Sequence, residues 1–202
     1  TMSRPRLLIY AKPPRMGLAK TRLAAGAGRT EARRIAHFTL AQTLRAVQAS
    51  GLDAALYLAP DRALGETLGG LLPAHLPRFS QGPGTLTHRL AKGLADSPAG
   101  PVLFIGTDAP DLTAARIRCA ARTLRRHDAV FGPASDGGFW LFGVNKRPGL
   151  PAIFEDVRWS GPHAMADLRA NLPGKFRVSL LETLQDVDEI SDWKSWNRDK
   201  NR

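Results

Sequence analysis

The chain has 202 residues and one cysteine, Cys119. A single cysteine excludes an internal disulfide and a cysteine-rich zinc site, and no apolar stretch approaches the roughly 20 residues of a membrane span. The 29 lysines and arginines exceed the 18 acidic residues and give a net charge of +11, which favours anionic partners. From its length we expect one domain over residues 1–202. We expect the protein in the cytoplasm, because the N-terminal apolar run is too short for a signal peptide.

Apolar runs typical of strands alternate with helical patterns along the chain. Strands are predicted over residues 6–11, 53–59, 101–106, 128–133, 139–144 and 176–181. Helices are predicted over about 30–50, through Leu64, Leu68 and Leu71, and over 112–126. The proline-rich stretches 71–84 and 145–175 are expected to be irregular, with one short strand in the first. This alternation predicts a single α/β domain whose sheet is mostly parallel and covered by helices on both sides.

In such a sheet, ligands bind beyond the carboxyl ends of the strands. Three candidate segments follow predicted strands: the basic loop at 12–23, the stretch 106–112, and the turn at 136–138. We expect all three along one edge of the sheet. Two arginine-rich stretches, 29–34 and 116–126, look helical and lack interleaved aromatic side chains that could stack on bases. For that reason we do not expect nucleic acid to be the main partner.

The first of these segments reads "KPPRMGLAKTRL". It is not a Walker A loop, because two residues separate Gly17 from Lys20. It nevertheless has the chemistry that phosphate needs: prolines restrict the loop, Gly17 lets the backbone approach closely, and Lys20 and Arg22 donate charged hydrogen bonds. A solvated basic turn is the alternative.

"FIGTDAPDL" places Asp108 at the end of a buried strand, where a charge is costly unless it is paired or bound to a metal. Asp111 or Thr113 could cap the following helix, which leaves Asp108 as a candidate ligand for a hard cation. Near the C-terminus, "LQDVDEISDW" is acidic. A helix N-terminus explains Glu189 and Asp192 better than Asp188.

Six motifs occur in the order expected of one family: "YAKPPRMGLAKTRL", "QGPGTLTHRL", "IGTDAPDL", "PASDGGFWLFG", "VRWS" and "LQDVDEISDW". From about Leu7 to Trp193 the chain resembles bacterial uncharacterised glycosyltransferase-like proteins of the nucleotide-diphospho-sugar transferase superfamily, some of which are labelled as arsenosugar-biosynthesis enzymes. It is also similar to 2-phospholactate and molybdenum-cofactor guanylyltransferases and to CMP-sugar synthetases.

The resemblance implies a GT-A-like three-layer α/β fold and a nucleotide site. The residues implied for nucleotide binding are Lys12, Pro13, Gly17, Lys20, Thr21, Arg22, Gln81 and Gly82. Asp108 and Asp188 would hold Mg²⁺ or Mn²⁺, and Lys20, Arg22 and Asp108 would be the catalytic residues. The acceptor side would contain Asp136, Gly137, Gly138, Trp159 and Ser160.

The sequence departs from the family pattern at Thr85, Thr87, Gly161 and Glu189, which puts donor or acceptor choice in doubt. The first hypothesis is glycosyl transfer from a nucleotide sugar to a small-molecule acceptor. The second is nucleotidyl transfer from a nucleoside triphosphate to a phosphorylated small molecule, with release of pyrophosphate. The third is a nucleic-acid-binding module that uses the net charge of +11.

Overall fold

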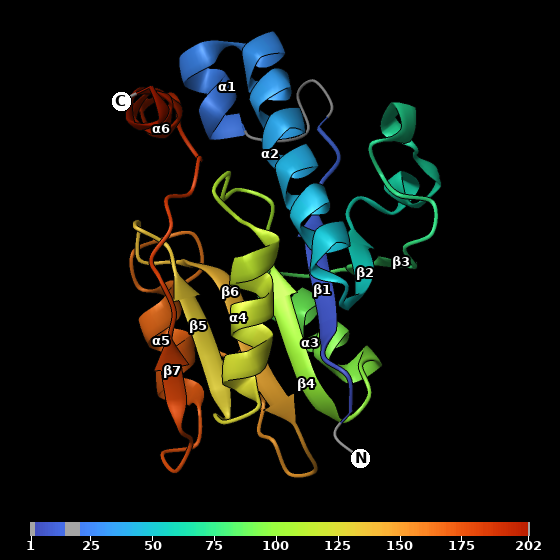
Figure 1. Cartoon of the computed structure of the whole chain (residues 1–202), viewed down its shortest axis with the longest axis vertical. Coiled ribbons are helices and arrows are strands. Elements are labelled where there is room, and N and C mark those ends of the chain that lie inside the picture. The colour runs from blue at the N-terminus through green and yellow to red at the C-terminus, as the bar shows by residue number, and fades with distance from the viewer. Residues whose placement is uncertain (1–2, 15–20, 202) are drawn as a thin grey trace.

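Within residues 3–14 and 21–201, which the computed structural model describes, seven strands form one sheet (Figure 1). The strands are β1 (Arg6–Ala11), β2 (Asp53–Leu58), β3 (Arg78–Ser80), β4 (Gly100–Ile105), β5 (Ala129–Pro133), β6 (Phe139–Lys146) and β7 (Val178–Leu180). Their order across the sheet is β3-β2-β1-β4-β6-β5-β7. Of these strands only β6 is antiparallel to its neighbours.

Helices cover both faces of this sheet. They are α1 (Thr21–Ala27), α2 (Arg29–Ser50), α3 (Leu86–Asp96), α4 (Ala114–Leu124), α5 (Ala164–Asn171) and α6 (Ile190–Lys200), with short 3₁₀ turns η1 (Asp61–Gly65) and η2 (Leu68–Gly70). In Figure 1, α2 and α4 lie in front of the sheet, α3 and α5 lie behind it, and α1 and α6 lie beyond the strand tips at the top. The predicted mostly parallel α/β architecture is therefore confirmed.

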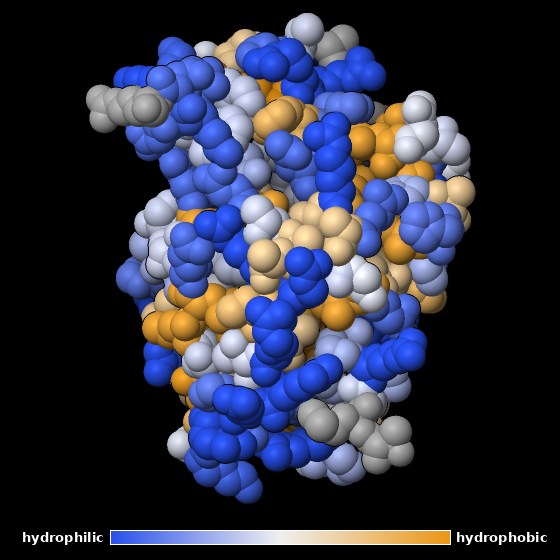
Figure 2. Space-filling model, viewed as in Figure 1, coloured by the Kyte–Doolittle hydropathy of each residue, from blue (hydrophilic) through white to orange (hydrophobic). Residues whose placement is uncertain are grey.

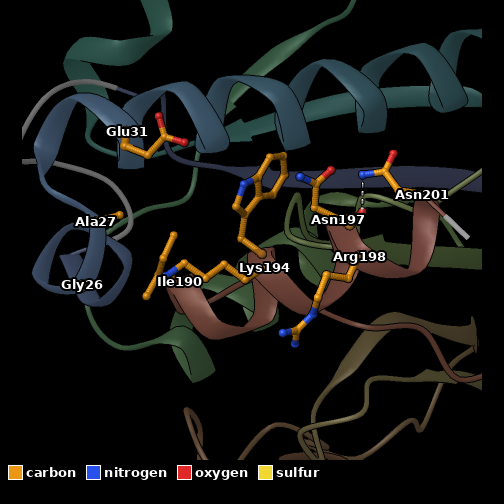
Figure 3. A pocket seen from close by; sticks show the side chains of 9 residues that line it. Gly26, Ala27, Glu31, Ile190, Lys194, Asn197, Arg198 and Asn201 are labelled. Carbon is orange, nitrogen blue, oxygen red and sulfur yellow. Dashed lines mark hydrogen bonds between the residues drawn. The ribbon is translucent and has the colours of Figure 1, made fainter.

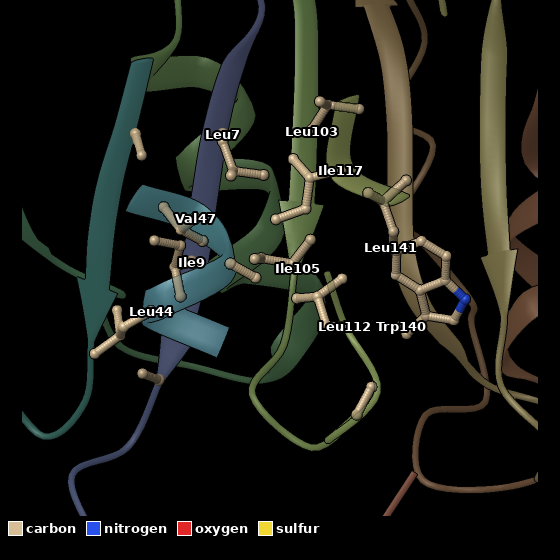
Figure 4. Close-up of a cluster of buried hydrophobic side chains, with 14 of the residues drawn as sticks. Leu7, Ile9, Leu44, Val47, Leu103, Ile105, Leu112, Ile117, Trp140 and Leu141 are labelled. Atoms are coloured by element: carbon tan, nitrogen blue, oxygen red, sulfur yellow. The ribbon is translucent and has the colours of Figure 1, made fainter. Parts of the chain in front are cut away.

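The central strands are apolar on both faces because both faces are covered. Successive residues of a strand point to opposite sides. Leu7 and Ile9 therefore join the core under α2 and α4 (Figure 4). Leu8 joins the core under α3 and α5. The continuous apolar run of β1, which the sequence showed, is the pattern expected of a strand buried in this way.

The helix predicted through Leu64, Leu68 and Leu71 is wrong. These leucines do pack against the core, as their spacing indicated. The backbone, however, forms η1 and η2, and Gly69 and Gly70 have φ angles of 65° and 90°. Residues with positive φ interrupt a right-handed helix, so the segment is held as two tight turns.

Three helices form where the sequence indicated none: α1, α3 and α5. Thr85 caps α3 together with His88, which occupies the position where a capping box usually has Glu or Gln. Helix α5 has eight residues and lies inside the proline-rich stretch expected to be irregular. No helix of the described residues is long and apolar enough to cross a membrane.

The arginine-rich segments 29–34 and 116–126 lie on the helices of the front face. Exposed positions of α4 and of the turn after it carry Arg118, Arg122, Arg125 and Arg126. Figure 2 shows this face, on which hydrophilic side chains surround the two helices. The helical conformation expected for both segments is confirmed.

Candidate active site at the carboxyl edge of the sheet

The three predicted site segments, as far as the structure describes them, lie at one edge of the sheet. Lys12 follows β1, Gln81 follows β3 and Asp108 lies three residues after β4. These strands are parallel, so their carboxyl ends meet at the same edge. The turn at 136–138 enters the antiparallel β6 from that edge. The expected convergence of the segments is confirmed for the described residues.

The first basic loop is described in part. Lys12 is exposed, whereas Pro13 and Pro14 are buried, and Arg33 of α2 donates to the Pro14 carbonyl at 3.3 Å. Gly17, Lys20 and the side chain of Thr21 lie outside the described residues. The predictions made for them therefore stay predictions.

Arg22, near the end of this segment, lies in the first turn of α1. Its Nη2 atom is 2.6 Å from Oε1 of Glu189, and both side chains are exposed. The pair connects the end of the basic loop to the start of α6. A second contact supports it, because Gly26 of α1 packs so closely on Ile190 that a Cβ atom there would lie 2.7 Å from Ile190 Cγ2.

Gln81 supports the backbone at the carboxyl edge. Its side chain is only 4% exposed, and its Nε2 donates to the carbonyls of Ala11 and Tyr57 at 3.2 and 2.9 Å. Both amide protons are thereby used to hold the ends of β1 and β2. Gly82, which follows at a φ of 82°, is also predicted to bind the nucleotide and is partly exposed, so it is more accessible than Gln81.

The two candidate metal ligands lie in neighbouring segments. The backbone N–H of Val187 donates to the carbonyl of Asp108 at 2.9 Å, and Asp188 is the next residue. Val187 is fully buried against Leu23 of α1 and Ile35 of α2. This packing fixes the segment carrying Asp188 beside the one carrying Asp108.

The donor set in these two segments is carboxylate oxygen. Among the described residues no group of three or more His, Cys, Asp or Glu side chains is arranged to hold a metal ion. Mg²⁺ is commonly bound through one or two carboxylates and the phosphates of the substrate, so Asp108 and Asp188 fit a substrate-assisted site better than a complete protein cage.

The glycines of the turn at 136–138 are required by its geometry. The N–H of Gly138 donates to Asp136 Oδ1 at 2.9 Å, so the aspartate stabilises its own turn. Gly137 has a φ of 91°, and a Cβ atom there would lie 2.2 Å from the Pro162 carbonyl oxygen. Met165 also donates to the Gly137 carbonyl at 3.2 Å. The turn is therefore packed against the segment that contains Trp159 and Ser160.

We call residues 155–163 the Trp159 loop. The indole Nε1 of Trp159 donates to Thr87 Oγ1 at 2.9 Å, and its ring packs edge-on to Phe139 with centroids 6.4 Å apart. Ser160 is exposed, with a φ of 61°. The structure thus brings all five residues predicted for the acceptor side, Asp136, Gly137, Gly138, Trp159 and Ser160, into one neighbourhood.

Three of the four departures from the family pattern have structural partners. Thr85 caps α3. Thr87 accepts from Trp159 and donates to the Phe154 carbonyl at 2.9 Å. Glu189 caps α6 and pairs with Arg22. Around Gly161 there is open space where a Cβ atom would stand.

A separate groove lies between α1, α2 and α6 (Figure 3). Its volume is about 570 Å³, and its walls are formed by Gly26, Ala27, Glu31, Ile190, Trp193, Lys194, Asn197, Arg198 and Asn201. Among the residues that the structure describes, none of those predicted for the site lines it. The groove adjoins the Arg22–Glu189 pair through Ile190, but it is not the place where the predicted site residues meet.

The family described as "Uncharacterized protein conserved in bacteria (DUF2064)" matches residues 40–161, more than half of the chain. The matched stretch contains Gln81, Asp108 and the turn at 136–138, and extends through Ser160; the first basic loop and Asp188 lie outside it. No curated protein is significantly similar to the chain.

Solved structures share the whole fold. A protein from Desulfovibrio desulfuricans G20, provisionally described as a nucleotide-diphospho-sugar transferase, is 26% identical at a TM-score of 0.80, covering 98% of this chain and 88% of that one. A 4-diphosphocytidyl-2C-methyl-D-erythritol synthase from Anaerococcus prevotii is 12% identical at 0.65, covering 98% and 99%. Rv0371c of Mycobacterium tuberculosis H37Rv, crystallised with manganese, is 15% identical at 0.58, covering 96% and 97%. The predicted resemblance and its fold are confirmed.

Proposed function

The chain belongs to the DUF2064 family, and from that premise we propose that it is a metal-dependent transferase that moves a glycosyl group from a nucleotide sugar to a small-molecule acceptor in the cytoplasm. The similarity in fold and sequence to the Desulfovibrio protein supports the nucleotide-activated donor. The single cysteine, exposed on α4, agrees with a reducing compartment.

The hydrogen bond between Val187 N–H and the Asp108 carbonyl carries this proposal, because it aligns two acidic segments 80 residues apart in the sequence. A divalent cation bound by Asp108 and Asp188 would offset the repulsion between their carboxylates and neutralise charge on the diphosphate. For scale, two carboxylates about 4 Å apart at an effective dielectric constant near 20 repel by about 4 kcal/mol. Manganese in the crystal structure of Rv0371c agrees with such chemistry on this fold.

The cationic side chains of the first basic loop bind the other side of the phosphates in this proposal. Lys12 lies at the end of β1, adjacent to the end of β4 that leads to Asp108. Lys20 and Arg22 donate to phosphate oxygens and stabilise the negative charge that develops on the leaving group. Gly82 lies at the nucleobase, and Gln81 holds the strand ends that shape its pocket.

On the acceptor side, the turn at 136–138 and the Trp159 loop orient the attacking molecule. A hydroxyl oxygen of the acceptor forms a bond to the anomeric carbon, while the bond from that carbon to the diphosphate oxygen breaks. The electron pair of the broken bond leaves with the nucleoside diphosphate, and the hydroxyl proton is lost to solvent or a nearby base. Binding both substrates in the reactive orientation supplies much of the rate acceleration in such a reaction.

Nucleotidyl transfer is the second candidate, and the likeness to the cytidyl-group synthase from Anaerococcus prevotii favours keeping it. In that reaction a phosphate oxygen of the acceptor attacks the α-phosphorus of a nucleoside triphosphate, and pyrophosphate leaves. A diphosphate group departs in both reactions. The same basic loop and acidic pair would therefore serve either reaction, because they would stabilise that group.

The experiment that tests the proposal begins with a thermal-shift panel. Nucleoside diphosphates, nucleoside triphosphates and nucleotide sugars are each added with Mg²⁺, with Mn²⁺ and with a chelator. We expect stabilisation by one nucleotide sugar and its diphosphate, and only with metal, because a ligand that binds the folded state raises its melting temperature. The stabilising donor is then incubated with the protein and a mixture of small hydroxylated acceptors.

The released product separates the candidates. A nucleoside diphosphate supports glycosyl transfer, whereas pyrophosphate from a triphosphate establishes nucleotidyl transfer and overturns the first candidate. If no nucleotide stabilises the protein and random duplex DNA binds with a steep dependence on salt, both transferase candidates fail and the net charge of +11 serves nucleic acid instead.

A further inference from the structure

The Trp159 loop is fixed from several sides before any substrate binds. Thr87 of α3 is the central contact, because its hydroxyl accepts from the Trp159 indole and donates to the Phe154 carbonyl, at 2.9 Å in each case. The threonine hydroxyl has one proton, which it donates to the Phe154 carbonyl, and its oxygen accepts the proton of the Trp159 indole. The indole is therefore held in one orientation across the gap between α3 and the loop.

The rest of the loop is held as firmly. Arg158 donates through its backbone N–H and guanidinium to the carboxylate of Asp167 on α5, at 2.8 to 3.0 Å. Asn171 donates to the carbonyls of Ile153 and Glu155. These contacts anchor the start and the middle of the loop to α5.

The backbone of this loop is also unusual. Asp156 and Ser160 have φ angles of 55° and 61°, in a region that residues other than glycine rarely adopt. Strained residues of this kind persist where the surrounding contacts enforce them, and they gather at sites that bind or react. The pair brackets Trp159, which is half-buried and next to Phe139 at the carboxyl edge.

The one lysine or arginine in the Trp159 loop is already paired. Over residues 134–164, all of which are described, there are three Lys or Arg side chains. Lys146 and Arg147 lie at the far end of β6, on the amino edge of the sheet, and Arg158 is held by Asp167. The remaining basic group is His163, which is exposed and ordinarily neutral at pH 7.

Exposed acidic side chains also lie in this stretch. Asp136, Glu155 and Asp156 are exposed, and Asp136 uses one oxygen to hold its own turn. A phosphate or carboxylate on the acceptor would meet this negative charge with no unpaired lysine or arginine from residues 134–164 to balance it. A neutral molecule with an apolar ring face and hydroxyl groups would match the indole and the nearby polar atoms.

We propose that the Trp159 loop is a pre-formed wall for the neutral, hydroxylated ring of the acceptor, and that Thr87 is the residue that positions Trp159 in it. The proposal rests on the proposed function for the identity of the reaction, but the wall itself can be tested without it. Thr87 acts through Trp159 and need not contact the substrate.

The test uses the full chain with ¹⁵N-labelled indole groups, and the Trp159→Phe variant assigns the Trp159 signal by its loss. Thr87→Val removes both hydrogen bonds at nearly constant shape, Thr87→Ser keeps them, and Thr67→Val is the control at an exposed threonine. We expect the Trp159 indole proton to shift and to exchange faster with solvent in Thr87→Val alone. An unchanged signal in that variant overturns the positioning role.

The ligand arm adds neutral hexoses, pentoses and N-acetylhexosamines and, separately, the 1-phosphates of the same sugars. Each is added with and without a mixture of ADP, CDP, GDP and UDP plus Mg²⁺. We expect a neutral sugar to move the Trp159 signal, and its affinity to fall by about three- to tenfold in Thr87→Val and to be restored in Thr87→Ser, in line with the loss of a hydrogen bond. Tighter binding of a 1-phosphate than of its neutral sugar at Trp159, or no response to any neutral sugar, overturns the wall.

The two proposals fail separately in this design. If neutral sugars move the Trp159 signal but no nucleotide binds in the thermal-shift panel, the wall stands and the transferase function falls. If a nucleotide binds with metal but no neutral sugar reaches Trp159, the nucleotide site stands and the wall falls.

Discussion

Glu189 competes with phosphate for the Arg22 guanidinium at the edge of the proposed phosphate site. Both side chains are exposed, and Arg22 Nη2 lies 2.6 Å from Glu189 Oε1, so the guanidinium that would bind a phosphate is already paired with a carboxylate. Glu189→Gln keeps an oxygen for capping α6 and removes the negative charge. We expect nucleotide affinity to rise by about two- to fivefold, because exposed ion pairs contribute about 0.2–1 kcal/mol. Titration of the variant and the native protein with the nucleotide that stabilises the protein measures this change in affinity.

Glu31→Gln is the matched control for this substitution. Glu31 pairs with Arg34 at the same distance, 2.6 Å, on the exposed side of α2. It should leave nucleotide affinity unchanged. Weaker binding in Glu189→Gln would instead mean that the carboxylate aligns Arg22 for the phosphate, and that the pair is kept in the complex.

Single residues differed in how much of their role could be read from the sequence. Thr113 caps α4 by accepting from Arg116, and Glu189 and Asp192 form the capping box of α6, both as their positions indicated. Capping is a local relation within a few residues, so a sequence shows it. The bond between Thr87 and Trp159 joins residues 72 positions apart, and no local pattern indicates it. The engagement of the Gln81 amide likewise depends on strands distant in sequence.

At the scale of elements, burial explains which predictions succeeded. The strands β1 and β4 are buried on both faces, so most of their residues are apolar and their limits are clear in the sequence. The α3 helix has no acidic residue in its first turn and is capped through His88, so its start lacked the usual signal. In the 61–71 segment, periodic leucines indicated a helix that the glycine backbone does not form.

The connection of the Trp159 loop to α5 depends on the ionisation of Asp167. Hydrogen bonds from the Arg158 guanidinium and backbone N–H hold the pKa of Asp167 well below its ordinary value of 3.8. A lowered pKa in the folded state means that this stabilisation is complete above pH 3.8 and is lost as the pH falls further below it. We expect Asp167→Asn to lower the melting temperature at pH 7 and at pH 5, and the difference from the native protein to shrink in stronger acid.

Asp199→Asn, at an exposed position of α6, is the control for that pH series. Thermal unfolding followed by circular dichroism from pH 7 down into strong acid measures all three proteins. A difference between Asp167→Asn and the native protein that stays constant at every pH would show that the carboxylate charge is not what anchors the loop.

At the scale of the whole molecule, the topology alone assembles the candidate site. Lys12, Asp108 and Asp188 are separated by up to 176 positions in the sequence, yet each lies near the carboxyl edge. The rule that ligands bind at this edge allowed the convergence to be predicted from the alternation of strands and helices, without any distance. It could not supply the contact between Val187 and Asp108, because that contact depends on how the segment after β7 crosses to the cluster formed by α1 and α2.

The metal site can be tested by comparing substitutions of aspartates at the two opposite edges of the sheet. Asp108→Asn keeps the size of the side chain and weakens the ligand at the carboxyl edge, whereas Asp53→Asn changes an exposed carboxylate at the first residue of β2, on the amino edge. Loss of groups that merely support a metal ligand costs about 10–100-fold in metal affinity, so we expect Asp108→Asn to reduce metal-dependent nucleotide binding by at least about tenfold. Calorimetric titration with and without Mn²⁺ measures this, and Asp53→Asn should behave as the native protein. If both variants retain the same metal dependence, the cation is held by other groups, and the alignment of Asp108 with Asp188 serves the fold alone.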